Sequence, residues 1–228
     1  TYEANAFLAV KIGFINEISD LCDAVGADVQ QVAKGIGLDK RIGSKFLHAG
    51  PGYGGSCFPK DTLALSKTAK DYGAPVTIVD TVVRSNKKRK KSMVDRIVSA
   101  CGGSVKGKTI AILGLTFKPN TDDMRESPSL VIIPELQKLG AKVRAFDPEG
   151  MKEAQRFLKN VTYCSDAYDC MTGANAAVVL TEWNQFRALD IAKTEELLKD
   201  KVFVDLRNIY QKDELEGSSL KYSSIGRP

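Results

Sequence analysis

A change in hydrophobic pattern near Val105 constrains the fold of this 228-residue chain more than any other feature. Before it, apolar residues recur at the three- and four-residue spacing of helices. This spacing predicts helices over residues 4–25, 29–35, 60–72 and 76–100. Residues 42–57 are rich in glycine and interrupt the pattern, which predicts a loop with unusual backbone conformations. The first hundred residues are therefore expected to be helical apart from one glycine-rich loop.

After Val105, short apolar runs of strand type alternate with helical stretches. The runs predict strands over residues 109–114, 142–146, 161–164, 176–180 and 202–205, separated by helices such as 129–139. Strands and helices that alternate at this spacing form a parallel sheet with helices on both faces. We therefore predict an α/β protein with two domains. Residues 1–104 form a helical central domain that ends in a long connecting helix, and residues 105–228 form a Rossmann-like parallel-sheet domain.

The composition restricts the class of ligand and partner. The chain carries 33 basic and 28 acidic side chains, which gives a net charge of +5. This excess suits an acidic small molecule such as a diphosphate and is too diffuse to indicate nucleic acid. No apolar run approaches the length that spans a bilayer, so no membrane association is expected. The chain starts at Thr1 within a helical pattern, so we expect it to be part of a longer protein.

The cysteines are odd in number and widely spaced. They are Cys22, Cys57, Cys101, Cys164 and Cys170, and no pair has the spacing of a zinc or redox motif. This predicts reduced thiols and a cytoplasmic location, without a disulfide framework. His48 is the single histidine, so neither a catalytic triad nor a histidine-rich metal site is expected.

Three motifs match nucleotide or nucleic-acid binding patterns but stand in the wrong context. Residues 102–109 match a phosphate-binding loop, yet they follow a helix and precede a strand, the reverse of the required order. Residues 50–55 match G-x-G-x-x-G without a preceding strand, so backbone packed close to a ligand explains the glycines better. Residues 87–91 are all basic but fall within a helix, where a solvated surface is the simpler interpretation. A nucleotide- or nucleic-acid-binding protein based on these motifs stays an alternative.

Cys57 and Asp61 are the candidates for chemistry. Cys57 ends the glycine-rich loop just before a helix that is expected to open at Pro59. The positive end of that helix and the neighbouring Lys60 both favour the thiolate, and the flanking glycines leave room for a substrate. Asp61 lies one helical turn further on, where it could accept a proton from an alcohol or a water. A buried, unreactive cysteine and an aspartate that only caps the helix form the alternative interpretation.

Segments along essentially the whole chain, in the same order, resemble the UDP-glucose/GDP-mannose dehydrogenase family. They are residues 5–9 (NAFLA) with 15–17 (INE), 50–61 (GPGYGGSCFPKD), 117–127 (FKPNTDDMRES), 181–186 (TEWNQF) and 204–208 (VDLRN). Tyr53 and the pair Phe58-Pro59 resemble the UDP-glucose branch more closely than the GDP-mannose or N-acetylhexosamine branches. Coincident motifs in family order are far more specific than any single one.

The resemblance implies an NAD-dependent oxidation of UDP-glucose to UDP-glucuronate in two hydride transfers. It implies that Cys57 captures the aldehyde as a thiohemiacetal, which is oxidised to a thioester. It implies that Asp61 orients or activates the water that releases the acid. Asn5 would help to hold the reacting oxygen, and Lys60 would support the anionic intermediates.

The resemblance also implies binding roles. The residues expected to bind the UDP-sugar are Phe46, Leu47, Gly50, Tyr53, Gly54, Gly55, Lys118 and Arg207. Arg41 is expected to reach the substrate of the neighbouring subunit in a homodimer, and Arg125 to reach toward NAD. The homodimer is expected to form through the long helix of residues 76–100 and the N-terminal helix. No metal ligand is expected.

Two departures from the family pattern limit what this chain is expected to do alone. The family's catalytic lysine falls at Thr1, and the family's NAD-binding domain would precede that residue. We therefore expect NAD to be bound mainly by a domain outside this chain, and this chain alone to be inactive. A non-catalytic UDP-sugar-binding and dimerisation module stays an alternative, as does a dehydrogenase of GDP-mannose or of a UDP-N-acetylhexosamine.

Overall fold

The computed structural model describes all residues from Thr1 to Pro228 and divides into two compact units. The first unit comprises Thr1–Lys90 together with Ile225–Pro228, and the second comprises Lys91–Ser224. The division falls within the long helix itself, whereas the hydrophobic pattern places a domain boundary after residue 104. The last residues of the chain belong to the helical unit, which the hydrophobic pattern does not predict.

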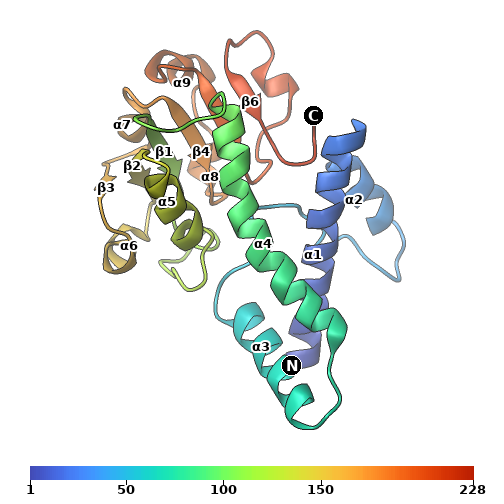
Figure 1. Ribbon diagram of the computed structural model, residues 1–228. Helices are drawn as coiled ribbons and strands as arrows, with labels where there is room; N and C mark the ends of the chain where they lie inside the picture. The colour runs from blue at the N-terminus through green and yellow to red at the C-terminus, as the bar shows by residue number, and fades with distance from the viewer. The chain divides into compact units, whose positions relative to one another are not determined.

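The helical unit contains the helices that the apolar spacing predicts (Figure 1). They are α1 (Tyr2–Val25), α2 (Val29–Gly37), α3 (Cys57–Asp71) and the first part of α4 (Thr77–Ala100). The end of α1 is set by Gly26, which adopts a left-handed φ of 77° and donates its N–H to Cys22. The start of α2 is set by Asp28, whose carboxylate accepts the Gln30 N–H at 2.7 Å. Local capping therefore explains the turn between these two helices.

The C-terminal residues pack closely against the junction of α1 and α2. The Gly226 carbonyl accepts the Val29 N–H at 2.8 Å. A Cβ at Gly226 would approach the Ser19 Cβ to 2.8 Å, and the residue has a φ of +61°, so glycine is required there on two counts.

The second unit is built on a six-stranded sheet in which every pair of neighbours is parallel. Its strands are β1 (Thr109–Leu113), β2 (Lys142–Phe146), β3 (Val161–Tyr163), β4 (Ala176–Val179), β5 (Val202–Asp205) and β6 (Lys221–Ser223), in the order β3-β2-β1-β4-β5-β6. The predicted fold class, a helical part followed by a Rossmann-like parallel sheet, is confirmed. The sixth strand is not predicted, because β6 is short and carries little apolar pattern.

Helices cover both faces of this sheet. The connecting elements are α5 (Ser129–Lys138), α6 (Met151–Phe157), α7 (Ala167–Met171), α8 (Asn184–Arg187), α9 (Ile191–Leu197) and a 3-10 turn (Asp213–Leu215). The strand order reverses direction between β1 and β4. Because parallel crossovers are right-handed, α5 and α6 lie on one face and α7 and α9 on the other. Ligands of such sheets bind outside the carboxyl ends of the strands, at the point where the order reverses.

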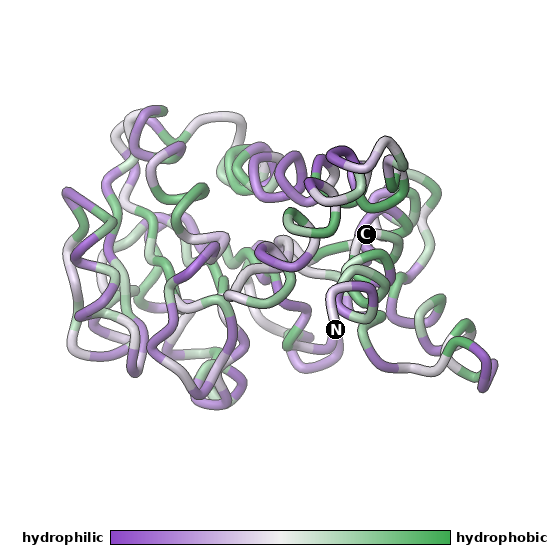
Figure 2. The backbone as a smooth tube through the Cα atoms, turned by 90° about the horizontal axis from the view of Figure 1, so that it is seen from below, coloured by the Kyte–Doolittle hydropathy of each residue, from purple (hydrophilic) through white to green (hydrophobic).

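The strands supply most of the core of the second unit. All residues of β4 and β5 are buried, as expected for central strands covered on both faces. Figure 2 shows how hydrophobic strand segments alternate with hydrophilic turns along this part of the chain. No helix anywhere in the chain is both long and apolar enough to cross a membrane.

Candidate active site

Cys57 is the first residue of α3, and its side chain is exposed while the other four cysteines are buried. The prediction that this helix opens at Pro59 is therefore wrong. A proline fits within the first helical turn because the N–H groups of that turn have no partner inside the helix. The thiol consequently lies at the exposed N-terminal end of the helix, directly after the glycine loop, which we define as residues 46–56.

Asp61 lies one turn after Cys57, on the same side of α3. Its carboxylate is buried and accepts hydrogen bonds from the Asn5 side chain of α1 at 2.6 Å and from Lys60 at 2.7 Å. The hydrogen bond from Lys60, then that from Asn5, hold the pKa of this carboxyl below its usual range, although burial acts in the opposite direction. Asp61 is therefore ionised at neutral pH and can accept a proton, but it cannot donate one.

Lys60 completes this network from the solvent side. Its ammonium group lies 5.5 Å from the centre of the Tyr2 ring, and its side chain is largely exposed. The hydrogen bond to Asp61 raises the pKa of Lys60, so it stays protonated. The structure thus brings Asn5, Lys60 and Asp61 into one hydrogen-bonded group at the start of α3.

The glycine loop is buried over most of its length. Leu47, Gly50, Tyr53, Gly54 and Gly55 are all buried, while Phe46 at its start is partly exposed. An aromatic cluster joins the two ends of the loop. The Phe58 ring packs edge-on against Phe46 at 6.0 Å and against Tyr53 at 5.9 Å between ring centres. The residue that follows Cys57 is thereby tied to the loop that precedes it.

In the second unit, Arg207 lies at the carboxyl edge of the sheet, just after β5. Its guanidinium donates to the Leu180 carbonyl at 2.8 Å and to the Phe117 carbonyl at 3.2 Å, and it forms an ion pair with Glu182 at 3.2 Å. Lys118, next to Phe117, is exposed and directs its ammonium over the Phe117 ring at 5.4 Å. Two of the predicted nucleotide-binding cations therefore come from neighbouring loops beside the β1/β4 reversal, where such sheets bind ligands.

Two family models match the chain: the central domain of the UDP-glucose/GDP-mannose dehydrogenase family over residues 1–88, and the UDP-binding domain of the same family over residues 111–212. The chain belongs to this family. The UDP-glucose 6-dehydrogenase of Rhizobium meliloti (strain 1021) is 57% identical over 227 residues, which is 100% of this chain and 52% of that protein. The UDP-glucose 6-dehydrogenase TuaD of Bacillus subtilis (strain 168) is 49% identical, over 100% of this chain and 49% of its own length.

Solved structures of the UDP-glucose/GDP-mannose dehydrogenase family share this fold. A UDP-glucose dehydrogenase from Pyrobaculum islandicum superposes with a TM-score of 0.85 at 36% identity, over 97% of this chain and 49% of that one. An NDP-N-acetyl-D-galactosaminuronic acid dehydrogenase from Methanosarcina mazei Go1 reaches 0.88 at 26% identity, over 99% and 50%. The chain spans about half the length of these family members.

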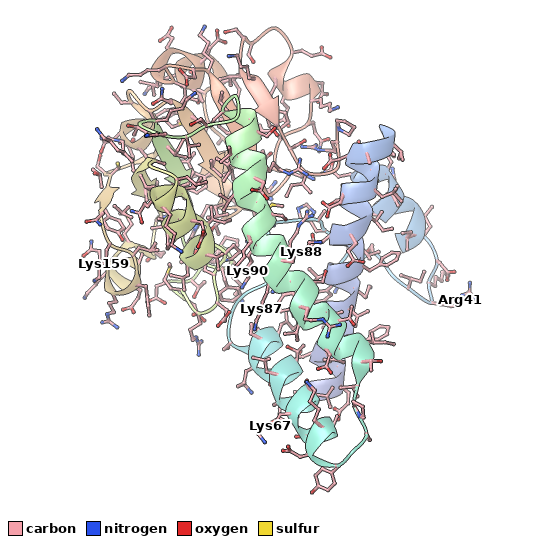
Figure 3. All side chains as sticks on the ribbon, viewed as in Figure 1. Arg41, Lys67, Lys87, Lys88, Lys90 and Lys159 are labelled. Atoms are coloured by element: carbon pink, nitrogen blue, oxygen red, sulfur yellow. The ribbon has the colours of Figure 1, made fainter.

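Two further arginines that the family resemblance singles out each pair with a nearby carboxylate. Arg41 stands in the turn after α2, where it pairs with Asp39 at 2.6 Å and projects outward with 89% of its side chain exposed (Figure 3). Arg125 pairs with Asp123 at 2.7 Å and is also largely exposed. Each is held by a carboxylate two residues before it, and their binding roles stay predictions.

The sheet of this family member does not fit a dinucleotide in the usual way. Dinucleotide-binding sheets place an acidic residue after the second strand to bind a ribose. Here Asp147 follows β2, but its buried carboxylate accepts the Leu115 N–H at 2.7 Å, the Gly150 N–H at 2.7 Å and the Trp183 indole N–H at 3.2 Å. The carboxylate is committed to holding its own loops together, so NAD is not expected on this sheet.

The basic run of residues 87–91 is only partly a solvated surface. Lys87 and Lys88 are exposed (Figure 3), but Arg89 is 5% exposed and donates to the glycine loop. The interpretation of the whole run as solvated is therefore wrong for Arg89 and for Lys90, which are both 5% exposed. The contacts of Arg89, together with those of Asn16 and Asn86, are the part of the site that sequence reasoning missed. The only signal was that Asn16 falls in a segment resembling the family.

Two of the buried thiols, Cys164 and Cys170, change each other's pKa. The contact with Cys170 lowers the pKa of Cys164, and the same contact together with burial raises the pKa of Cys170. Cys164 is therefore more acidic than an ordinary buried thiol. Its side chain is nonetheless only 5% exposed. Cys164 and Cys57 therefore differ in how accessible the sulfur is to reagents, and reactivity depends on this access as well as on acidity.

Proposed function

We propose that this chain is the catalytic-thiol and UDP-sugar-binding part of a UDP-glucose 6-dehydrogenase, which oxidises UDP-glucose to UDP-glucuronate with NAD. The observation that carries the proposal is the group at the start of α3. An exposed thiol follows a buried glycine loop, and an ionised Asp61 held by Asn5 and Lys60 lies one turn away. This is an arrangement for covalent capture of an aldehyde and for hydrolysis of the thioester formed after its oxidation.

The proposed roles follow from the chemistry of each group and its place at the start of α3. Cys57 adds as the thiolate to the aldehyde carbon, which gives a thiohemiacetal. The protonated Lys60 and the Asn5 amide stabilise negative charge that develops on the reacting oxygen. After oxidation to the thioester, Asp61 accepts a proton from the water that attacks it, and the Cys57 thiolate leaves with the electron pair of the C–S bond.

NAD, when bound to the complete protein, supplies the two-electron acceptor for each of the two oxidations. Within this chain we propose that Arg125 alone reaches toward it. A cytoplasmic location accords with the five unpaired thiols, which a reducing compartment preserves.

Substrate binding is proposed for two groups of residues. The glycine loop, with Phe46, Leu47 and Tyr53, encloses the sugar end of the substrate. Lys118 and Arg207 bind the diphosphate. The exposed Lys118 ammonium carries this proposal, because the Arg207 guanidinium already pairs with Glu182 in the neighbouring loop.

A homodimer is proposed through the long helix α4 and the N-terminal helix α1, and an apolar stripe on α1 supports it. Phe7, Phe14 and Leu21 recur every seven residues and stay 67%, 48% and 56% exposed. Such a stripe on a water-facing helix is a typical contact surface between subunits. Arg41 is proposed to reach the substrate of the partner subunit. A strictly monomeric mass by light scattering at high protein concentration would exclude this assembly.

UDP-glucose is favoured over another nucleotide sugar. The relatives that are 57% and 49% identical are UDP-glucose 6-dehydrogenases, whereas the N-acetyl-galactosaminuronic acid dehydrogenase is 26% identical. A module that only binds UDP-sugar would not need a buried aspartate paired with an asparagine and a lysine beside an exposed thiol. The asparagine, lysine and aspartate therefore favour an enzyme over a binding module.

We expect the 228-residue chain to bind UDP and UDP-glucose more tightly than NAD by about tenfold or more, or about 1.4 kcal/mol. The physical reason is that Lys118 and Arg207 are present, whereas the carboxylate that would bind an NAD ribose is occupied by backbone amides. Isothermal titration calorimetry with the three ligands measures this directly. Tight NAD binding without UDP binding would contradict the proposal.

A further inference from the structure

The glycine loop has an unusual structural problem. Residues 47–55 contain no helix or strand, yet nearly all of them are buried. Buried backbone N–H and C=O groups need hydrogen-bond partners, and an irregular loop cannot supply them to itself. Here the partners are side chains from two helices of the same unit, α1 and α4.

Asn86 of α4 provides the most specific of these contacts. Its side-chain oxygen accepts the Tyr53 N–H at 2.9 Å, and its side-chain nitrogen donates to the Tyr53 carbonyl at 3.0 Å. The amide thus pairs with both backbone groups of one residue, as a neighbouring strand would. Asn86 is itself 8% exposed, so neither bond competes with bulk water.

Asn16 and Arg89 hold the loop at a second point. The Asn16 side-chain oxygen accepts the Gly50 N–H at 2.9 Å, and the Arg89 Nε donates to the Gly50 carbonyl at 2.9 Å. Arg89 also donates to the Asn16 carbonyl at 3.2 Å and forms an ion pair with Asp20. Both backbone groups of Gly50 are therefore satisfied by residues that are fixed to each other.

The loop can approach Asn86 only because position 52 is glycine. A Cβ at Gly52 would lie 3.0 Å from the Asn86 side-chain oxygen and 3.0 Å from the Lys90 side chain, and Gly52 has a φ of +113°. Glycine at position 52 therefore permits the close approach through which Asn86 holds the backbone of Tyr53.

We propose that Asn86 is a positioning residue for the sugar-binding loop, acting together with Asn16 and Arg89. It fixes the backbone at Tyr53, whose ring contacts Phe58 next to Cys57, so the shape of the loop and the surroundings of the thiol are set together. This inference rests on the proposed function of the loop.

The test is Asn86→Ala in the full-length protein, assayed at a temperature where the variant is fully folded. We expect the KM for UDP-glucose to rise by about tenfold, because small misplacement of binding groups costs this much or more, while the KM for NAD stays unchanged. A role in stability alone would leave both KM values as they are once the variant is fully folded, and would show only as a lower melting temperature. Wild-type KM values in the folded variant would therefore overturn the proposal.

Ser85→Ala is the matched control. Ser85 is the residue before Asn86 and also bridges α4 to α1, through a 3.0 Å hydrogen bond to Glu17, but it does not contact the loop. We expect wild-type KM values for this variant. An equal rise in the KM for UDP-glucose in both variants would show that any disturbance between the helices has the same effect, and would also overturn the proposal.

Asn16 offers a second pair if Asn86→Ala does not fold. Asn16→Asp keeps the oxygen that accepts the Gly50 N–H, whereas Asn16→Ala removes it. We expect the alanine variant to raise the KM for UDP-glucose and the aspartate variant to restore most of the loss. Equal KM values for the two would contradict the inference. If the wild-type protein itself neither binds nor oxidises UDP-glucose, the proposed function fails instead, which is a distinguishable result.

Discussion

Replacing Cys57 by serine in the full-length protein is expected to reduce the formation of UDP-glucuronate by about three orders of magnitude or more, as the loss of a covalent nucleophile does in other enzymes. A serine hydroxyl is a far weaker nucleophile than a thiolate, and the ester that it would form hydrolyses more slowly than a thioester. The first oxidation, from alcohol to aldehyde, does not need the thiol and should persist. Rapid-quench analysis of sugar products, alongside NADH formation, separates the two steps.

Cys22→Ser is the control for this substitution. Cys22 is a buried thiol of α1 in the same unit, and no role in catalysis is proposed for it. Its variant should form UDP-glucuronate at a rate within a few-fold of wild type. If Cys57→Ser formed UDP-glucuronate at the normal rate, a covalent mechanism through Cys57 would be excluded.

The second large effect is expected for Asp61→Asn, which should lower kcat by roughly two to three orders of magnitude, the usual range for loss of a general base. The asparagine is nearly the same size, and its oxygen can still accept the hydrogen bond from Asn5, so the fold is expected to persist. What it loses is the ability to accept a proton. The thiol remains able to add to the aldehyde, so the thioester should accumulate and be visible in the intact mass of the protein.

Asp71→Asn is the matched control, because Asp71 lies on the same helix and also pairs with a lysine, Lys67, at 2.6 Å, but is exposed. We expect no change in kcat for it. In the wild-type enzyme, the lowered pKa of Asp61 keeps its carboxylate ionised as the pH falls through the usual aspartate range. Loss of activity that tracks this group should therefore begin only at more acidic pH. An unchanged kcat for Asp61→Asn would assign the carboxylate a structural role.

Much of the fold follows from patterns that lie close together in the sequence. The strands of the second unit are apolar runs of nearly the right length, and Gly26 and Asp28 mark the turn between α1 and α2 by local capping. The start of α3 is misplaced because a proline opens many helices at their first residue but is tolerated throughout the first turn. Strand β6 has no comparable apolar pattern. Its backbone hydrogen bonds with β5 stabilise it as a strand, and these cannot be predicted from its own sequence.

The candidate site can be predicted from the sequence only where its residues are of reactive types or belong to a family motif. Cys57 and Asp61 are reactive residue types at a meaningful spacing, and the resemblance to the family adds Asn5 and Lys60. Asn86 and Arg89 carry no such mark, because an amide or a guanidinium within a polar helix is ordinarily solvated. Their role depends on a loop more than thirty residues away in sequence, which packs against them only after folding.

Cys57 is expected to be the fastest of the five cysteines to react with an alkylating agent near neutral pH in the 228-residue chain, because it alone is exposed. Cys164 is the informative competitor. The contact with Cys170 lowers its pKa, but burial should keep the reagent away.

Peptide mapping after limited alkylation, with and without UDP-glucose, tests the central claim that this thiol lies in a UDP-sugar site. We predict that Cys57 is labelled first. UDP-glucose at saturation should slow this labelling by roughly tenfold, since a bound sugar excludes the reagent from the thiol. NAD at the same concentration should give no protection. Faster labelling of Cys22, Cys101, Cys164 or Cys170, or labelling of Cys57 that UDP-glucose leaves unchanged, would contradict the claim.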